Sequence, residues 1–267
     1  MSDESDVPLF EHNHAEEPVF LAGNMLEAAR LQKNLPPLAV PHGCLLDFDG
    51  ELVEFLLMTG AATHEPAWPC FHTRLYRWSA NGTEFGIIGG TVGASFAVLV
   101  AEELFALGCR ALVTISSAGL IAEQLQTPLF LLIEQALRDE GTSYHYLPPE
   151  RYAQASSPLL EAVTRRLNDA GLQCIRGKSW TTDAPFRETQ KLITARRDEG
   201  IISVEMEAAA LLAMGAALNK PVICFAHITN SMATREDDFE KGGDDGHETA
   251  LKVCALALSA LINIKGA

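Results

Sequence analysis

From Phe85 to the C-terminus, short apolar runs alternate with longer helical patterns, and this alternation constrains the fold more than any other feature of the sequence. Phe85–Ile88 is predicted to be a strand, Ala94–Leu107 a helix, and Ala111–Ile115 a buried strand. A strand, a helix and a second strand in this order indicate two parallel strands of one sheet, joined by a right-handed crossover.

The alternation continues through the second half of the chain. Helices are predicted at Pro158–Ala170, Arg187–Arg197, Glu205–Leu218 and His247–Ile262, and strands at Cys174–Trp180, Ile201–Val204 and Val222–Ile228. Strands that alternate with helices are typical of a layered α/β fold. No repeat or linker divides the sequence, so we expect one domain over residues 1–267. Residues 1–40 are then a polar N-terminal extension with one short helix, at Gly23–Lys33.

The charge of the chain excludes several classes of partner. With 35 acidic and 20 basic residues, the formal net charge is −15, and no run of lysine or arginine offsets it. Such a field repels a nucleic-acid backbone or an anionic membrane, so we expect neither as a partner. No apolar run reaches the roughly 20 residues that span a bilayer. The acidic N-terminus and the widely spaced cysteines lead us to expect a cytoplasmic protein.

Polar residues at the predicted strand ends are the candidate ligand contacts, because ligands of open α/β sheets bind beyond the carboxyl ends of the strands. The turn Gly89–Gly93 lets a ligand approach the backbone at the start of a helix, although it lacks the dinucleotide-binding spacing and a plain tight turn explains it equally well. Ser116 and Ser117 follow the next strand and could donate to an anion or a sugar oxygen. Capping of a turn is the simpler interpretation of these serines.

Two carboxylates, Glu205 and Glu207, stand at the start of a nearly all-apolar helical pattern. The helix dipole favours acids at this position, which is the simplest explanation for them. A helix this apolar should be buried, however, and burying acids is costly unless donors satisfy them. Because vicinal sugar hydroxyls are suitable donors, these residues indicate a sugar-binding site.

Two further segments carry groups suited to recognising a heterocyclic base. Asn230, at the end of a predicted buried strand, can both donate and accept hydrogen bonds. A loop near residues 181–188 brings together an acid, an aromatic ring and a base, as Asp183, Phe186 and Arg187. Such a combination suits stacking and polar recognition, but taken alone it is only suggestive.

Together these segments resemble the nucleoside phosphorylase-I family, which includes uridine phosphorylases, hexameric purine nucleoside phosphorylases and methylthioadenosine/adenosylhomocysteine nucleosidases. The similarity runs from about Phe85 to the C-terminus and is most specific at Val204–Ala209, which reads Val-Glu-Met-Glu-Ala-Ala. The resemblance implies a three-layer αβα sandwich around a mixed, partly barrel-like sheet. It also implies a homo-oligomer, which would be a dimer, a trimer or a hexamer.

The site that the resemblance implies needs no metal and no cofactor, with inorganic phosphate as co-substrate. Its residues fall into four groups: Glu205, Met206 and Glu207 for the ribose; Thr91, Gly93 and Ser117 for phosphate; Phe186 and Arg187 for the base; and Asn230 and Asp183 as catalytic residues. Glu207 would stabilise the positive charge that develops on the sugar as the bond to the base breaks.

The sequence departs from the family pattern at the phosphate site. Family phosphorylases carry an early glycine-aspartate-proline segment with a phosphate-binding arginine, where this chain has Pro41–Leu46. A second expected arginine is Thr114. Each missing charged hydrogen bond is worth roughly 1.5–3 kcal/mol. Either His72, Arg74 or Arg77, from this or a neighbouring subunit, replaces these arginines, or the nucleophile is not phosphate.

Base identity stays open as well, since purine-specific members have an aspartate where Asn230 stands, and an asparagine cannot act as that acid. Our hypothesis is a nucleoside phosphorylase that serves nucleoside salvage, releasing a free base and (deoxy)ribose 1-phosphate. The alternatives are a nucleosidase that uses water and a nucleoside-binding protein without turnover. A serine hydrolase built on Ser117 and His227 is the weakest of the candidates.

Overall fold

The computed structural model describes residues 7–231 and 246–264, apart from the side chains of residues 230 and 231. Its strands are β1 (Gly43–Asp47), β2 (Ala62–His64), β3 (Tyr76–Ala80), β4 (Thr83–Gly89), β5 (Ala111–Leu120), β6 (Leu129–Asp139), β7 (Tyr152–Gln154), β8 (Ile175–Thr182), β9 (Ile201–Glu205) and β10 (Val222–Ser231). They form one mixed sheet in the order β10-β6-β8-β9-β5-β1-β4-β3-β2, with β7 beside β6. Because β10 also pairs with β5, the strands β5, β10, β6, β8 and β9 close into a barrel.

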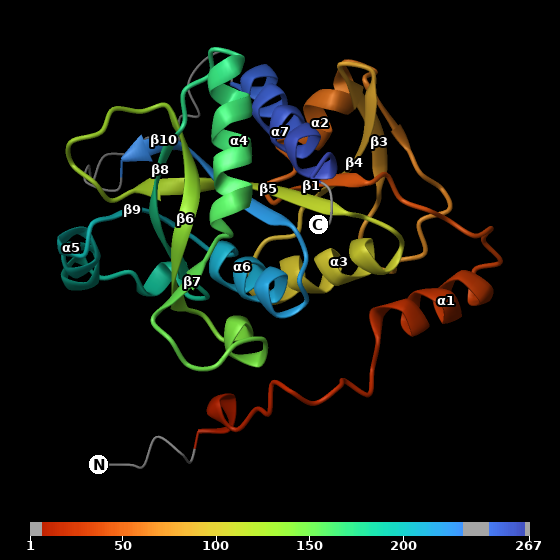
Figure 1. The fold of residues 1–267 in the computed structure, drawn as a ribbon, viewed down its shortest axis with the longest axis horizontal. Helices are drawn as coiled ribbons and strands as arrows, with labels where there is room; N and C mark the ends of the chain where they lie inside the picture. The colour runs from red at the N-terminus through yellow and green to blue at the C-terminus, as the bar shows by residue number, and fades with distance from the viewer. Residues whose placement is uncertain (1–6, 232–245, 265–267) are drawn as a thin grey trace.

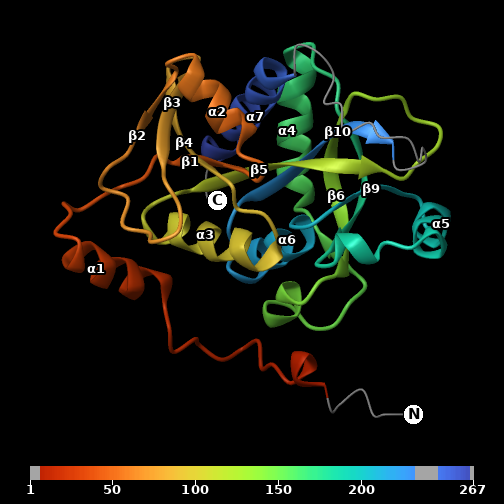
Figure 2. The same cartoon turned by 180° about the vertical axis from the view of Figure 1, so that it is seen from behind.

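Helices cover both faces of this sheet. They are α1 (Ala22–Gln32), α2 (Glu51–Met58), α3 (Ala94–Ala106), α4 (Ser157–Asp169), α5 (Gln190–Asp198), α6 (Ala208–Ala217) and α7 (His247–Ile262). In Figure 1, α2, α4 and α7 lie on one face and α3 and α6 on the other, while Figure 2 shows the same layers from behind. The predicted three-layer α/β sandwich with a partly barrel-like sheet is confirmed.

Burial explains why the central elements are so apolar. The first eight residues of α6 are all buried, because this helix packs against the sheet on one side and α3 on the other. Strand β1 is buried along its whole length and pairs in parallel with both of its neighbours. Parallel strands with helices on both faces read as continuous apolar runs. The same packing holds the carboxyl ends of β1, β4 and β5 at one edge of the sheet.

The predicted crossover unit needs one correction. Strands β4 and β5 are parallel, as expected, but they are not neighbours, because β1 lies between them and pairs with both. Strand β5 also runs on through Ser116 and Ser117 to Leu120, where it pairs with β10. These serines are therefore strand residues and not part of a turn.

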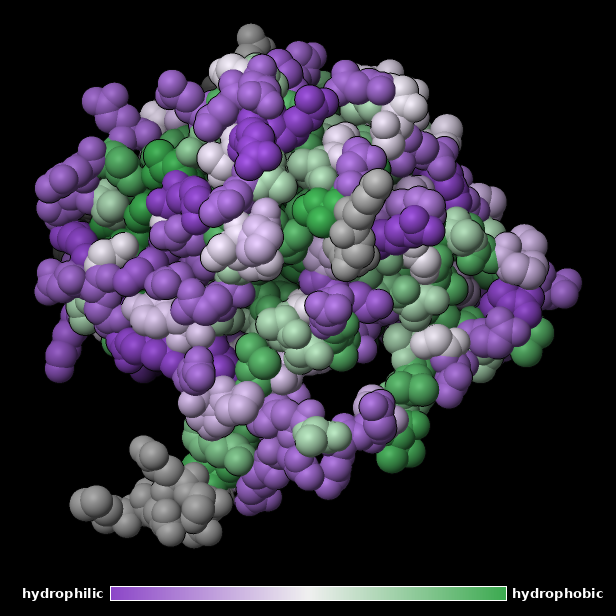
Figure 3. All heavy atoms as spheres, in the orientation of Figure 1, coloured by the Kyte–Doolittle hydropathy of each residue, from purple (hydrophilic) through white to green (hydrophobic). Residues whose placement is uncertain are grey.

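The helical pattern predicted at Glu205–Leu218 begins three residues later than expected. Glu205 ends strand β9, and α6 starts only at Ala208. The helix Gly23–Lys33 is confirmed within one residue, as α1, which buries Leu26 and Ala29 and packs against α3. Figure 3 shows an opening between the N-terminal segment before α1 and the rest of the molecule. None of the described helices is long and apolar enough to cross a membrane.

Candidate active site

The carboxyl ends of β1, β4, β5 and β10 meet at one edge of the sheet. Asp47, the last residue of β1, lies opposite Gly89 on one side and Ile115 on the other. On β10, His227 lies opposite Ser117. Segments that are far apart in the sequence, and that carry most of the polar residues singled out above, therefore converge here.

Glu207 is almost fully buried at this edge, with 2% of its surface exposed. Its Oε1 accepts a hydrogen bond from the backbone N–H of Gly93 at 2.7 Å, and its Oε2 accepts one from the N–H of Met206 at 3.2 Å. Burial raises the pKa of Glu207 to about 8, and the negative charges of Glu205 and Asp49 add to the increase. The glycine turn before α3 and the acidic motif before α6 thus meet, as the resemblance implied.

Glu205 is also buried, but its oxygens accept hydrogen bonds from groups of the protein itself. Its Oε1 accepts hydrogen bonds from the hydroxyls of Ser179 and Thr181, at 3.1 and 2.6 Å. Its Oε2 accepts from the backbone N–H groups of Glu207 and Ala208, at 2.8 and 2.6 Å. With four donors on two oxygens, Glu205 positions Glu207 and the start of α6. We therefore reassign it from ribose contact to a positioning role.

Asp49, in the turn between β1 and α2, is a residue that the sequence analysis missed. Its Oδ2 accepts two hydrogen bonds from Ser117, one from the backbone N–H at 3.0 Å and one from the hydroxyl at 2.6 Å. The donors of Ser117 that were assigned to phosphate are therefore bound to a carboxylate, as is the N–H of Gly93. An acid-rich run directly after an apolar run, Asp47 to Glu51, was the available signal.

Asp47 lies deeper than Asp49, with 3% of its surface exposed. Its Oδ2 accepts the backbone N–H of Val53 in α2 at 3.0 Å. Burial raises the pKa of Asp47 to about 7, and the charge of Asp49 contributes. Thr91, the third predicted phosphate ligand, is completely buried, and its hydroxyl has no hydrogen-bond partner among the described residues.

Three of the residues predicted to contact or protonate the base, Asp183, Phe186 and Arg187, follow the end of β8, whose Thr181 donates to Glu205. Asp183 accepts the backbone N–H of Gly141 at 2.9 Å, so it braces the loop before the 3-10 helix η3 (Thr142–His145). Phe186 and Arg187, in the 3-10 helix η4 (Pro185–Arg187), are exposed, Phe186 completely. Asn230 belongs to β10, but its side chain lies outside the described residues.

Within this chain, no contact among the described residues joins the cations considered as replacements for the missing arginines to Gly93, Ser117 or their carboxylate partners. Arg77 is held by Glu65 and Glu84, at 2.6 Å each, and His72 and Arg74 are exposed. In the part of the chain that the structure describes, no group of three or more histidine, cysteine, aspartate or glutamate side chains is arranged to hold a metal.

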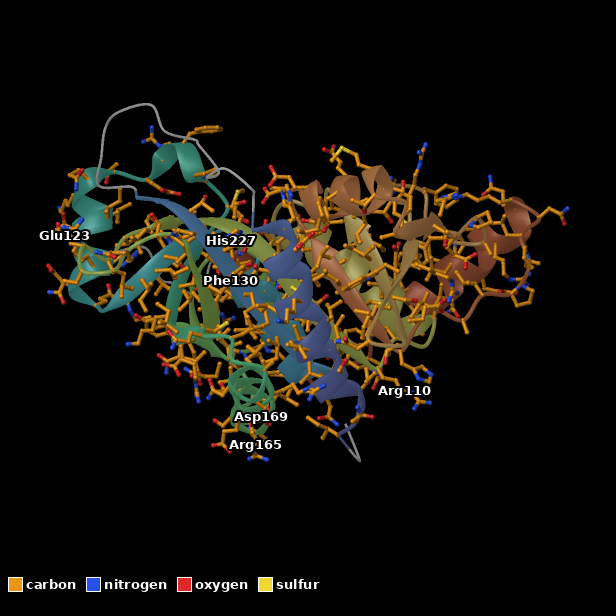
Figure 4. The ribbon with its side chains drawn as sticks, turned by 90° about the horizontal axis from the view of Figure 1, so that it is seen from above. Arg110, Glu123, Phe130, Arg165, Asp169 and His227 are labelled. Atoms are coloured by element: carbon orange, nitrogen blue, oxygen red, sulfur yellow. The ribbon has the colours of Figure 1, made fainter. Side chains whose placement is uncertain are left out.

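A cavity of about 390 Å³ opens beside the Asp49–Ser117 pair and extends between α2, α7 and the end of β10. Its lining residues are Asp47, Asp49, Glu51, Leu52, Glu54, Met58, Ile115, Ser116, Ser117, Pro128, His227, Thr229, Gly246, His247 and Ala250. Figure 4 shows His227 next to Phe130, and their rings stack at 4.5 Å with an angle of 9° between the planes.

Comparison with known proteins agrees with this arrangement. The sequence model of the phosphorylase superfamily matches residues 42–263. This chain belongs to the phosphorylase superfamily. The match starts at His42 and therefore includes β1 and the Asp47–Asp49 turn, whereas the sequence motifs had placed the similarity only from Phe85.

Relatives of this superfamily member are nucleoside phosphorylases, at low identity. It is 23% identical over 190 residues to the guanosine phosphorylase of Halorubrum lacusprofundi, covering 68% of this chain and 79% of that protein. It is 23% identical over 197 residues to the uridine phosphorylase of Haemophilus influenzae, covering 68% and 78%. The uridine phosphorylase structure from Vibrio fischeri ES114 has the same fold, with a TM-score of 0.66 and 20% identity over 87% of this chain and 95% of that one.

Proposed function

We propose that this superfamily member cleaves the N-glycosidic bond of a nucleoside, and that water, not phosphate, is the nucleophile. The names of its relatives and the buried carboxylate of Glu207 support the first part. The observation that carries the second part is the pair of hydrogen bonds from Ser117 to Oδ2 of Asp49.

Phosphate would meet unfavourable electrostatics at this edge of the sheet. The N–H groups of Gly93 and Ser117, with the Ser117 hydroxyl, already donate to carboxylates. A phosphate would have to displace these carboxylates and then lie beside them, which like charges oppose. No lysine or arginine is among the described residues that line the adjoining cavity, so none of those side chains offsets the repulsion. Water carries no charge, so the negative charge of Asp49 does not repel it.

In the proposed reaction, Glu207 holds the sugar hydroxyls while the bond between C1′ and the base breaks and the base leaves with the electron pair. Asp49 stabilises the positive charge that develops on the sugar, and Glu207 adds to this when it is deprotonated, which its pKa of about 8 favours above neutral pH. Asp49 accepts a proton from the attacking water, whose oxygen bonds to C1′, and Ser117 keeps Asp49 in position. The departing base gains a proton, for which Asp183 remains our predicted donor. No cofactor is needed.

The test is base release from a panel of purine and pyrimidine nucleosides, with and without inorganic phosphate, followed by chromatography of both products. We expect the free base and the free sugar at a rate that phosphate does not increase. Release that requires phosphate and gives a sugar 1-phosphate would overturn the proposal of hydrolysis.

Phosphorolysis is the second candidate, because the relatives are named as phosphorylases of guanosine, uridine and purine nucleosides. It requires the Asp49 side chain to leave Ser117 when phosphate binds. The same panel separates the two reactions, since only phosphorolysis consumes phosphate in proportion to the base that is released.

A further inference from the structure

The N-terminal segment runs outside the other elements, from the 3-10 helix η2 (Pro8–Phe10) to α1, as Figures 1 and 2 show. No residue of η2 is buried, and residues 13–21 are all exposed. We propose that residues 7–14 form a pH-sensitive strap, which docks on η3 while His12 and His145 are neutral and is released when both are protonated. Docking and release would not depend on which reaction the site catalyses.

Three side chains of the strap reach η3. The ring of Phe10 contacts the ring of Tyr144 edge to face, with 5.3 Å between their centroids. Nε2 of His14 donates a hydrogen bond to the backbone carbonyl of Tyr144 at 2.9 Å. The rings of His12 and His145 lie 4.0 Å apart and are tilted by 44°. Because so little surface is buried here, a modest change in free energy can open the contact.

The pair of His12 and His145 makes the docking sensitive to pH. Nε2 of His12 is shielded from solvent and has no hydrogen-bond partner among the described residues. A protonated imidazole carries an N–H on both ring nitrogens, so protonation of His12 would bury a donor without an acceptor. Protonation of both rings would also bring two positive charges into contact, and these repel each other. The docked strap therefore favours the neutral pair.

The pKa of His145 gives the direction of the effect. Partial burial lowers this pKa, and the charges of His12 and His14 lower it further. The docked strap then binds fewer protons than the released strap. Docking is therefore stable above the ordinary histidine pKa of about 6.5 and weakens as the pH falls below it. His14 keeps its hydrogen bond when protonated, because its Nε2 is the donor in either form.

No opposite charge compensates a protonated pair in the described structure. The titratable and charged groups around it come from residues 11–17, from the segment that contains η3 and from α3; they are Glu11, His14, Glu16, Glu17, Arg138, Asp139, Glu140, Tyr144, Tyr146, Glu150 and Glu102. None of these carboxylates forms an ion pair with the ring of His12 or His145. Glu140 instead accepts the backbone N–H of Ser143, and Glu102 accepts the hydroxyl of Tyr146. Helix α6, which also packs on η3, carries no titratable side chain.

Release of the strap reaches beyond η3. Phe10 forms one wall of a cavity of about 380 Å³, together with Tyr144 and Arg138, so release removes that wall. Gly141, directly before η3, donates its backbone N–H to Asp183 at 2.9 Å. A strap that leaves η3 therefore withdraws support from the segment that braces Asp183.

Hydrogen exchange of the full chain tests the release. Exchange is followed by mass spectrometry from about pH 7.5 to about pH 5, with EDTA present, and is corrected for the rates of an unfolded chain at each pH. We expect the protection of residues 8–14 to fall about tenfold or more, since one pKa unit corresponds to a factor of ten. The protection of residues 141–147 should fall with it, while that of β1 stays constant. Protection of residues 8–14 that does not change with pH would overturn the proposal.

Two variants and one control assign the release to the histidine pair. His12→Phe keeps a ring in the contact but cannot be protonated, so the strap should stay docked throughout the range. His145→Phe removes the second charge and should move the release to lower pH. His64→Phe, at an exposed histidine of β2, should release the strap as the native protein does. Release at the native pH in both strap-contact variants would contradict the proposal.

Titration of His145 by NMR is a second measurement, which does not require any variant to dock. If protonation of His145 favours release, then undocking must raise the pKa of His145. His12→Ala removes the ring contact, so the pKa of His145 in this variant should lie closer to about 6.5 than in the native protein. The same pKa of His145 in both proteins would show that docking and protonation are not linked, and the proposal would fail.

Discussion

Asp49 accepts two hydrogen bonds from Ser117 on a single carboxylate oxygen, at 3.0 Å from the backbone N–H and 2.6 Å from the hydroxyl. This contact fixes the turn after β1 against the strand β5. It also places a negative charge where the family resemblance implied a phosphate. Our proposal that water is the nucleophile rests on this contact, and the first prediction concerns its removal.

Replacing Asp49 by alanine should abolish most of the phosphate-independent base release. A general base contributes about 10²–10⁴-fold to a rate, so we expect kcat to fall by about a hundredfold or more. The same change frees both donors of Ser117, so inorganic phosphate should bind the variant more tightly than the native protein. Product analysis and phosphate titration measure the two effects. Unchanged hydrolysis in Asp49→Ala would rule out Asp49 as the base.

Glu207→Gln should remove activity while leaving the fold intact. The amide keeps an oxygen to accept the N–H of Gly93, but it cannot lose a proton to give the carboxylate that stabilises the developing cation on the sugar. We expect kcat to fall about a hundredfold or more, with unchanged circular dichroism. A variant with native kcat would show that Glu207 does not contact the reacting sugar.

The stability of the protein should fall as the pH rises from about 5 to 7. Asp47 and Glu207 have pKa values raised to about 7 and about 8, so the folded protein keeps protons that the unfolded chain has already lost. Folding then takes up protons, and raising the pH opposes it by up to about 1.4 kcal/mol per pH unit for each group. Thermal unfolding across this range measures the slope.

Two variants show which residues cause this fall in stability with rising pH. Asp47→Asn and Glu207→Gln should each flatten the fall in Tm, because the amides do not titrate. Asp169→Asn, at an exposed aspartate of α4, serves as the control and should leave the slope as it is. If both buried variants keep the native slope, the titrating groups lie elsewhere.

The sequence marked several residues that meet at the candidate site because its signals were local. The end of β9, the glycine turn before α3 and the serines of β5 were each recognisable as polar residues beside apolar runs, and the sheet brings them together. Helix α7 was predicted within its observed bounds, since its apolar pattern is long.

The missed features depend on contacts between distant segments. Strand β1 is only five residues long, and its partners come from residues 86–89 and 111–115, so no local pattern marked it as central. The role of Asp49 depends on Ser117, which lies 68 residues away. For the same reason, the sequence could not show that Glu205 and Glu207 have different roles, because the role of Glu205 depends on hydrogen bonds from Ser179 and Thr181.

Glu205→Gln should destabilise the protein and reduce activity indirectly. The glutamine can keep one oxygen as an acceptor, but its NH₂ group then faces donors that the carboxylate now satisfies. Leaving buried donors unpaired costs about 1–3 kcal/mol, so we expect a loss of this size in chemical denaturation. Thr181→Val, which removes one of the four donors, should cost less. A Glu205 variant as stable as the native protein would contradict the positioning role.

The backbone N–H of Gly93 donates to Glu207 in the candidate site, and the backbone conformation of Gly93 allows the importance of this contact to be tested. Its φ of +94° is one that L residues rarely adopt, while no atom lies within 4 Å of the position that a Cβ would take. Gly93→Ala therefore adds backbone strain without a clash, and we expect a loss of about 1–3 kcal/mol of stability together with a weaker contact to Glu207. Gly23→Ala, inside helix α1, should instead stabilise the protein by about 0.5–1 kcal/mol. Urea denaturation of both variants separates the effect of backbone strain from a general effect of alanine on stability. If Gly93→Ala is as stable as Gly23→Ala, the turn can relax, and the φ of Gly93 does not hold its N–H in place.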